Sequence, residues 1–171
     1  MRWLWEAIAL PDTPASVAGP FATVSTSALL FRAGARVCAL SVQQVLEVMR
    51  PLPVQEVVNL PLFVQGLTMI RGAPTPVVSL ASLFADSGRP PTRFVVVRAG
   101  DRPVALAVDS VLGVIELGPA TLHALPPLAQ SAGTATLLAI GALDAQLLFV
   151  LNSTSLIPDE VWQRWPLSSH D

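Results

Sequence analysis

A stretch of seventeen residues occurs twice in this chain, and it limits the possible folds more than any other feature. Residues 32–48 and 98–114 align at an offset of 66 residues, and ten of the seventeen positions are identical. The identical pairs are Arg32/Arg98, Ala33/Ala99, Gly34/Gly100, Arg36/Arg102, Ala39/Ala105, Leu40/Leu106, Val42/Val108, Val45/Val111, Leu46/Leu112 and Val48/Val114. Two copies in a chain of 171 residues predict two similar halves that pack together, and not a solenoid.

Each copy has the pattern of a β-hairpin. An apolar run comes first, at residues 27–31 and 93–97, and an Ala-Gly pair separates it from a second apolar run. Glycine supplies the positive φ that a tight hairpin turn needs. Further short apolar runs follow at close spacing between Gly and Pro residues, a pattern typical of small barrels. We therefore expect a mainly all-β fold of two pseudo-symmetric five-stranded β-barrels, with short helices and a C-terminal helix.

The composition of two segments predicts where the chain divides. Residues 1–26 contain a stretch rich in Pro, Ser, Thr and Ala and read as an N-terminal extension and linker, and residues 86–92 contain Gly and Pro and read as the join between the halves. The remaining body, residues 27–165, is expected to comprise a first barrel at about 27–85, a second at about 92–157 and a helix at about 158–165.

Four shorter predictions complete the reading of the two halves. Residues 54–58 resemble a strand, residues 65–80 a hairpin, and residues 118–133, with three prolines, a long loop. A last hairpin is expected to turn near residues 142–145.

Composition favours a protein that works by contact with other proteins. Only 13% of the residues are charged, against about 25% in a typical soluble protein. Large neutral or apolar surfaces follow, and such surfaces usually mark contacts with partners. The net charge of −2 comes from scattered residues, so the basic stripe that nucleic-acid binding requires is not expected.

The single cysteine and the lengths of the apolar runs predict a cytoplasmic location. Cys38 has no second cysteine with which to form a disulfide, and its place in an apolar run predicts a buried, inert thiol in a reducing compartment. The apolar runs fall short of the roughly 18–20 residues that a spanning helix needs, so no direct membrane insertion is expected.

The sequence contains no recognisable catalytic or metal-binding motif. His123 and His170 lack a second His or a Cys at metal-ligand spacing, and no nucleophile elbow, phosphate-binding glycine loop or Cys-x-x-Cys is present. We therefore expect no cofactor, no metal and no enzymatic activity. The alternative is a small-molecule sensor or enzyme that uses the cleft between the barrels, with Asp109, His123 and Arg71 as its polar groups.

Five motifs in order resemble the CheW family of chemotaxis coupling proteins: FRAG, VCALSVQQVLEV, VQEVVNLPLFVQGLTMIRGAPTPVVSL, FVVVRAGDRPVALAVDSVLGVIEL and LLAIGALDAQLLFVLN. The resemblance covers roughly residues 27–157. It implies SH3-like barrels around a shared apolar core, and a non-enzymatic adaptor between chemoreceptor cytoplasmic tips and the regulatory domain of a CheA-type histidine kinase. It also implies self-association in rings, through contacts between unlike ends, and a location at receptor arrays beneath the inner membrane.

The same resemblance implies which residues bind partners. Arg71 and Gly72 match the tip of the family's Asn-Leu-Arg-Gly hairpin, and Gly66 matches the glycine that opens that hairpin. Val45 and Glu47 match a Val-x-Glu segment beside the receptor groove. Val114 matches an apolar groove position in the second barrel.

Four features depart from the family pattern. Met69 stands where the family has Asn, Ser79 stands where it often has Asp, and Pro74 is an additional proline. The fourth is the N-terminal extension, where Trp3, Leu4, Ala7 and Ile8 lie at helical spacing. This segment is either a docking peptide, for a partner or for the domain's own surface, or a loosely held extension.

Overall fold

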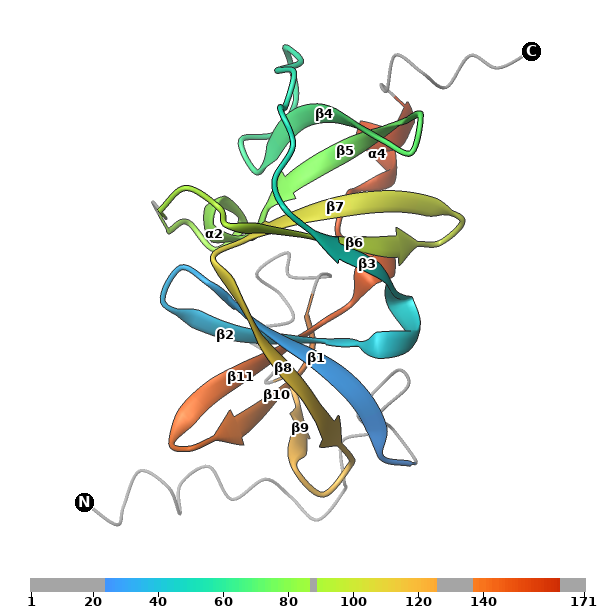
Figure 1. The fold of residues 1–171 in the computed structure, drawn as a ribbon. Helices are drawn as coiled ribbons and strands as arrows, with labels where there is room; N and C mark the ends of the chain where they lie inside the picture. The colour runs from blue at the N-terminus through green and yellow to red at the C-terminus, as the bar shows by residue number, and fades with distance from the viewer. Residues whose placement is uncertain (1–23, 87–88, 126–136, 164–171) are drawn as a thin grey trace.

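Two twisted β-sheets lie one above the other and make up most of the molecule (Figure 1). The computed structural model describes residues 24–86, 89–125 and 137–163. The six-stranded sheet has the order β8 (Ser110–Leu117), β1 (Thr26–Ala33), β2 (Arg36–Ser41), β11 (Gln146–Leu151), β10 (Leu137–Leu143) and β9 (Leu122–Ala124). The five-stranded sheet has the order β3 (Val45–Met49), β6 (Arg93–Ala99), β7 (Arg102–Val108), β5 (Ala73–Ser79) and β4 (Val64–Ile70). The expectation of a mainly β fold with two similar halves is confirmed.

The two copies of the repeat form matching hairpins in different sheets and then exchange their third strands. The first copy forms β1 and β2, and the second forms β6 and β7. After β2 the chain crosses over through the short 3-10 helix η1 (Val42–Gln44), and β3 pairs with β6 of the other copy. After β7 the chain crosses back, and β8 pairs with β1. The predicted ranges 27–85 and 92–157 therefore describe two sequence halves, each of which contributes strands to both sheets.

Both faces of the repeat hairpins are buried, which explains why their sequences are apolar without interruption. One face of each hairpin packs into a core shared by the two sheets, and the opposite face packs into a smaller core within its own sheet. The shared core contains equivalent residues of the two copies: Leu29/Val95, Phe31/Val97, Cys38/Val104 and Leu40/Leu106. Side chains alternate between the two faces of a strand, so the repeat supplies both cores from one sequence pattern.

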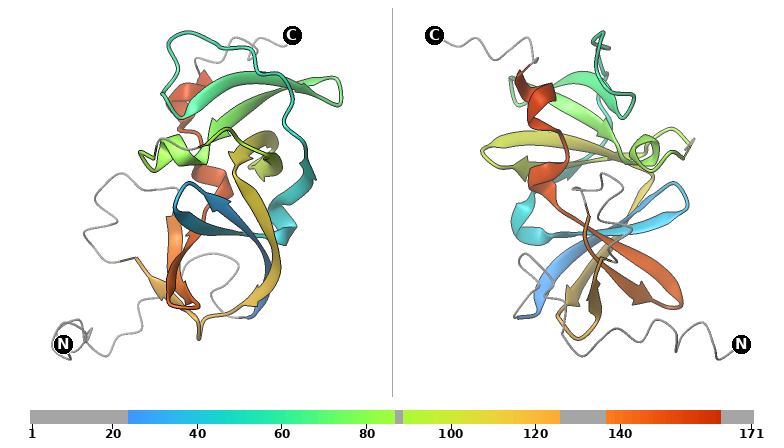
Figure 2. Two further views of the ribbon diagram at one scale, coloured as in Figure 1. Left: turned by 60° about the vertical axis from the view of Figure 1, so that its left-hand side comes forward. Right: turned by 180° about the vertical axis from the view of Figure 1, so that it is seen from behind.

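Short helices follow the last strand of each half. The four-residue helix α2 (Leu80–Leu83) begins after Ser79, whose hydroxyl accepts a hydrogen bond from the backbone N–H of Ser82 at 3.2 Å. Serine at this position thus caps the helix. In the second half the 3-10 helix η2 (Ser153–Ser155) and α4 (Asp159–Gln163) run along the back of the molecule from the lower sheet to the upper one (Figure 2). The predicted C-terminal helix is confirmed as far as the structure describes it.

Two details of the strand prediction differ from the structure, and two hairpin predictions agree with it. The predicted loop at residues 118–133 contains β9, which makes the first sheet six-stranded, because Leu122 is buried and its strand pairs with β10. The predicted strand at residues 54–58 makes only one isolated bridge, between Gln55 and Leu67. The hairpin predicted at residues 65–80 is present as β4 and β5, and the last hairpin turns at Asp144 and Ala145 as expected.

Candidate functional site: an apolar strip across the two sheets

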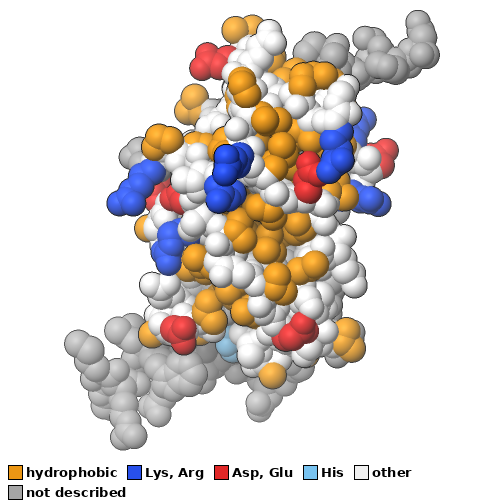
Figure 3. Space-filling view, viewed as in Figure 1, with side chains coloured by type: hydrophobic (Ala, Val, Ile, Leu, Met, Phe, Trp, Pro, Cys, Tyr) orange, Lys and Arg blue, Asp and Glu red, His pale blue; other side chains and the backbone are white. Residues whose placement is uncertain are grey.

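The third strands of the two repeats, β3 and β8, each carry two large apolar side chains on the outside. Leu46 and Val48 of β3 are 47% and 42% exposed, and Leu112 and Val114 of β8 are 48% and 59% exposed. Hydrophobic side chains gather in a band over these two strands on the face shown in Figure 3. We call these four residues the apolar strip.

A β-bulge at the same place in both copies produces this arrangement. On β3, Val45 pairs with Val97 and Glu47 with Val96, so Leu46 is the additional residue. On β8, Val111 pairs with Phe31 and Gly113 with Leu30, so Leu112 is the additional residue. A bulge bends its strand and re-aims the neighbouring side chains, and such bulges are frequent at functional sites. Because Leu46 and Leu112 are equivalent in the repeat, the strip has the pseudo-symmetry of the fold.

An ion pair lies on β3 beside the strip. Glu47 is partly buried between Leu46 and Val48, and its Oε2 accepts hydrogen bonds from Nε of Arg71 at 2.9 Å and from Nη2 at 2.5 Å. The hydrogen bond to Glu47, followed by the attraction of its charge, raises the pKa of the Arg71 guanidinium above its usual value. The structure thus joins two residues that the family resemblance had singled out separately.

The turn between β4 and β5 places Arg71 opposite Glu47. Arg71 and Gly72 are the two residues of this turn, and both have positive φ, 51° and 78°. Two consecutive positive φ angles define the tight turn that matches the twist of a hairpin. Arginine is unusual at such a position, and the two hydrogen bonds to Glu47 hold its side chain there.

Two other predicted site residues have structural positions. Val45 is half-buried and packs against the shared core. Gly66 has a φ of 143°, and a Cβ at this position would overlap the carbonyl oxygen of Gln55. The close approach lets Gln55 and Leu67 exchange two backbone hydrogen bonds, of 2.7 and 2.9 Å. Gly66 therefore permits the segment before it to lie across β4, in line with its place at the start of the hairpin.

Three of the four strip residues, Leu46, Val48 and Leu112, were not predicted from the sequence. A pocket of about 660 Å³ lies nearby, between the segment after β3 and the β4–β5 hairpin, and its lining includes Met69 and Pro74. These two are among the positions that depart from the family pattern. The repetition of the Leu-x-Val pattern at residues 46–48 and 112–114 was the signal that could have identified the strip.

The polar residues of the alternative, small-molecule reading belong to separate structural contacts. Asp109 accepts a hydrogen bond from the backbone N–H of Gly34 at 3.0 Å, Arg71 is paired with Glu47, and His123 lies on β9 at the edge of the six-stranded sheet. Across residues 24–86, 89–125 and 137–163, no cluster of three or more His, Cys, Asp or Glu residues could hold a metal ion.

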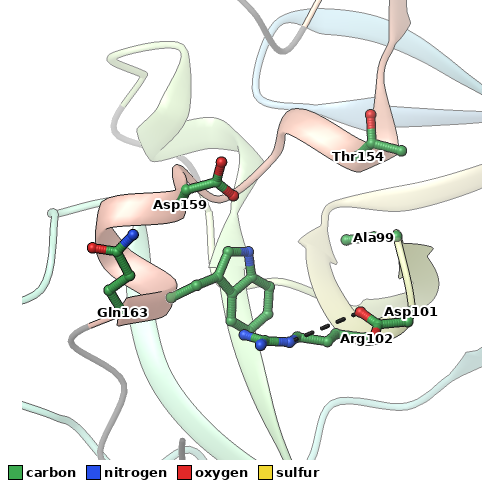
Figure 4. A pocket seen from close by; sticks show the side chains of 8 residues that line it. Ala99, Asp101, Arg102, Thr154, Asp159 and Gln163 are labelled. Atoms are coloured by element: carbon green, nitrogen blue, oxygen red, sulfur yellow. Dashed lines mark ion pairs between the residues drawn. The ribbon is translucent and has the colours of Figure 1, made fainter.

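A second surface pocket, of about 500 Å³, lies between the β6–β7 turn and α4 (Figure 4). The guanidinium carbon of Arg102 lies 4.9 Å from the centre of the Trp162 ring, and Nε of Arg102 lies 3.9 Å from Oδ1 of Asp101. Asp159 and Gln163 of α4 line the other side. The lining is mixed, polar and apolar, unlike the apolar strip.

Comparisons with known proteins agree with this architecture. The family model described as CheW-like domain matches residues 27–161. The curated chemotaxis protein CheW of Klebsiella aerogenes is 28% identical over 141 residues, which are 81% of this chain and 85% of that protein. The crystal structure of the scaffolding protein TtCheW from Thermoanaerobacter tengcongensis has the same fold, with a TM-score of 0.67 at 22% identity. That match covers 75% of this chain and 90% of the solved chain.

In the described part of the chain, no helix has the length and apolar character to cross a membrane.

Proposed function

Because this chain belongs to the CheW-like domain family, we propose that it couples the cytoplasmic tips of chemoreceptors to a CheA-type histidine kinase. It is a scaffold of the chemotaxis type and not an enzyme. It transmits the state of the receptor by binding alone, at receptor arrays on the cytoplasmic face of the inner membrane. The pathway it serves is of the chemosensory kind, with chemotaxis, pilus motility or surface sensing as its output.

The apolar strip is the observation that carries the receptor part of this proposal. The resemblance to the CheW family implies that the receptor tip is a helical hairpin. An amphipathic helix binds by placing its apolar side chains against an apolar surface. The strip offers four exposed apolar side chains from two strands, in a protein with few charges. The ion pair between Arg71 and Glu47 supplies a polar border, as interface rims do.

Exposed apolar residues at the two ends of the molecule support contacts with the kinase and between copies. Val58 and Leu62 are exposed residues of the segment between β3 and β4, which lies at the end of the molecule formed by the five-stranded sheet (Figure 1). Leu147 is an exposed residue of β11, in the sheet at the opposite end (Figure 1). The two ends present different surfaces, so a head-to-tail contact between them is heterologous and can close into a ring. The resemblance to the family implies that the regulatory domain of the kinase has the same fold. That domain could therefore occupy the position of one copy in such a ring.

Calorimetric titration with a receptor-tip fragment tests the receptor part. We expect Val114→Asp to weaken binding about tenfold to a hundredfold, because the interface would bury an unpaired charge. Leu147→Asp is the matched control, since Leu147 has nearly the same exposure but lies away from the strip, and it should bind as the unaltered chain does. Equal weakening by both variants, or no binding by the unaltered chain, would overturn the assignment of the strip.

Titration with the regulatory domain of the kinase tests the other partner. The unaltered chain should bind this domain with micromolar affinity. Arg71→Glu places two carboxylates side by side at the hairpin tip and should weaken assembly with kinase and receptor together. Failure of the unaltered chain to bind the kinase domain would contradict the coupling role.

A further inference from the structure

We propose that residues 3–8 of this chain dock on its own apolar strip and compete there with the receptor. The docking stands on the geometry of the strip and the chain, whereas its effect on receptor binding rests on the proposed function. Trp3, Leu4, Ala7 and Ile8 form one apolar face if the segment is helical, and they lie outside the residues 27–161 that the family model matches.

The strip is an apolar surface that the described residues leave exposed. Its four side chains are 42–59% accessible, although leucine and valine on a strand normally face a core. Covering them removes apolar surface from water, which is favourable for any apolar segment within reach. Trp3, on the same helical face as Leu4 and Ile8, gives the N-terminal segment a large apolar side chain with which to cover them.

The described chain starts beside the strip. Thr26 at the start of β1 pairs with Leu117, and Leu29 pairs with Val114. Val114 is therefore three residues, about 10 Å, along the strand from the point where the chain enters the sheet. The fifteen residues 9–23 can span at most about 50 Å, and a flexible chain of that length has a typical end-to-end distance of about 20 Å.

The other exposed apolar residues are less suitable for this segment. Val58 and Leu62 belong to the segment between β3 and β4, which lies at the end of the molecule opposite the start of β1 (Figure 1). Leu147 belongs to the six-stranded sheet but stands without another exposed large apolar side chain on its strand. Val24, just before β1, is 62% exposed but is a single side chain, whereas the strip offers four exposed apolar side chains and includes Val114 close to the start of β1.

A tether of this length converts a weak contact into an effective competitor. A short flexible linker holds its ends at an effective concentration of about 1 mM, so a contact of millimolar affinity would be formed in about half of the molecules. Only molecules with an open strip can bind the receptor, so the apparent affinity equals the intrinsic affinity multiplied by the fraction of strips that are open. We expect release of the segment to tighten receptor binding by about twofold to tenfold.

Disulfide trapping in the full chain tests the docking without any partner. The test pair is Leu4→Cys with Val114→Cys, and the matched control is Leu4→Cys with Leu147→Cys, because Val114 and Leu147 are 59% and 61% exposed. Cys38 does not interfere, since it is fully buried and burial raises the pKa of its thiol to about 12. Upon oxidation with diamide, the test pair should form an intramolecular disulfide at least about fivefold faster than the control pair, detected as a loss of two hydrogens in the intact mass.

Equal rates for the two pairs, or a disulfide-linked dimer from the test pair, would overturn docking within one molecule. In the second case the strip would take the segment of another copy. A separate titration of the full-length variant Leu4→Asp/Ile8→Asp with the receptor-tip fragment tests the competition. Tighter binding than that of the unaltered chain supports it, and unchanged binding overturns it. A third outcome separates the two proposals. If the test pair forms its disulfide but the receptor-tip fragment binds neither the unaltered chain nor the Leu4→Asp/Ile8→Asp variant, the proposed function is contradicted and the docking stands.

Discussion

The two copies of the repeat form the same hairpin, but their turns are held in different ways. In the first copy the backbone N–H of Gly34 donates to Asp109 and that of Ala35 donates to Asp86, both at 3.0 Å. In the second copy a Cβ added at Gly100 would meet nothing within 4 Å, and Asp101 lies beside its own neighbour Arg102. Both glycines have nearly the same φ, 61° and 68°.

A further pair of contacts is common to both hairpins. The guanidinium carbon of Arg36 lies 5.0 Å from the centre of the Phe84 ring, just after α2, and that of Arg102 lies 4.9 Å from Trp162 in α4. Each hairpin thus meets an aromatic ring from the helix region that ends its own sequence half. The repeat specifies the hairpin and its arginine, whereas Asp86, outside both copies, helps to fix the first turn. The first turn is thus held by two carboxylates from other parts of the chain, and the second borders a surface pocket (Figure 4).

The largest expected contrast is between Gly34→Ala and Gly100→Ala. Both substitutions place alanine at positive φ, which costs about 1–2 kcal/mol. At Gly34 the new Cβ also overlaps the Asp86 carboxylate, and displacing it removes the hydrogen bond to Ala35, so the total should be about 3 kcal/mol. Urea unfolding of the two variants measures the difference, and equal destabilisation would show that the carboxylates do not constrain the first turn.

Asp109→Ala should destabilise the chain by about 1–2 kcal/mol, because the partly buried N–H of Gly34 loses its acceptor. Gln43 is the equivalent position in the first copy, is exposed, and should tolerate alanine at a cost below about 0.5 kcal/mol. Asp109→Asn retains an acceptor oxygen and serves as the conservative control. Thermal unfolding of the three variants gives the ranking, and an Asp109→Ala chain as stable as the Gln43→Ala chain would contradict it.

Cys38 gives the first copy a titrating group where the second has Val104. Burial raises the pKa of the Cys38 thiol from 9.0 to about 12, against a smaller opposing effect of Arg36. Between these values the unfolded chain loses this proton and the folded chain keeps it. The free energy of unfolding should therefore be unaffected below pH 9 and fall above it, by about 1 kcal/mol at pH 10.

Replacing Cys38 with valine makes the first copy resemble the second and should remove this part of the pH dependence. Chemical denaturation of both chains from pH 8 upward measures it. Identical slopes would show that the thiol ionises as easily in the folded chain as in the unfolded one.

The smallest effect is expected from the arginines over the aromatic rings. Arg102→Gln should cost about 0.5–1 kcal/mol, the usual range for an exposed cation over a ring. Arg36→Gln should cost slightly more, because the Arg36 guanidinium also lies 6.0 Å from the centre of the Phe149 ring. Denaturant unfolding compares the two variants through their midpoints, provided that the unfolding free energy depends on denaturant equally in both. A larger loss of stability in Arg102→Gln than in Arg36→Gln would argue against an additional contribution from Phe149.

The hairpins could be predicted from the sequence because the apolar runs and the Ala-Gly pair depend on local geometry. The exchange of third strands could not, since Val45–Met49 could pair with either copy's hairpin on its alternation alone. β9 was not predicted because a strand of three residues is too short to show an alternating apolar pattern, and prolines near it indicated a loop. Ion pairing between Arg71 and Glu47 joins residues 24 positions apart and depends on that exchange.

The orientation of the strip is the least predictable feature. Simple amphipathic reasoning would bury Leu46 and Val48 and expose Glu47, but the structure turns Glu47 toward the partly buried face and the two apolar residues outward. A bound partner would cover Leu46 and Val48 and so bury them. A strand whose apolar side chains face outward is therefore expected at a contact surface.

Formation of a three-component complex tests the central claim most directly. The regulatory domain of the kinase, a receptor-tip fragment and this chain should sediment together, whereas the first two should not do so without the chain. Val114→Asp should lose the receptor fragment from the complex and retain the kinase domain. Kinase and receptor fragments that never co-sediment in the presence of this chain would contradict the account of the molecule as a coupling scaffold.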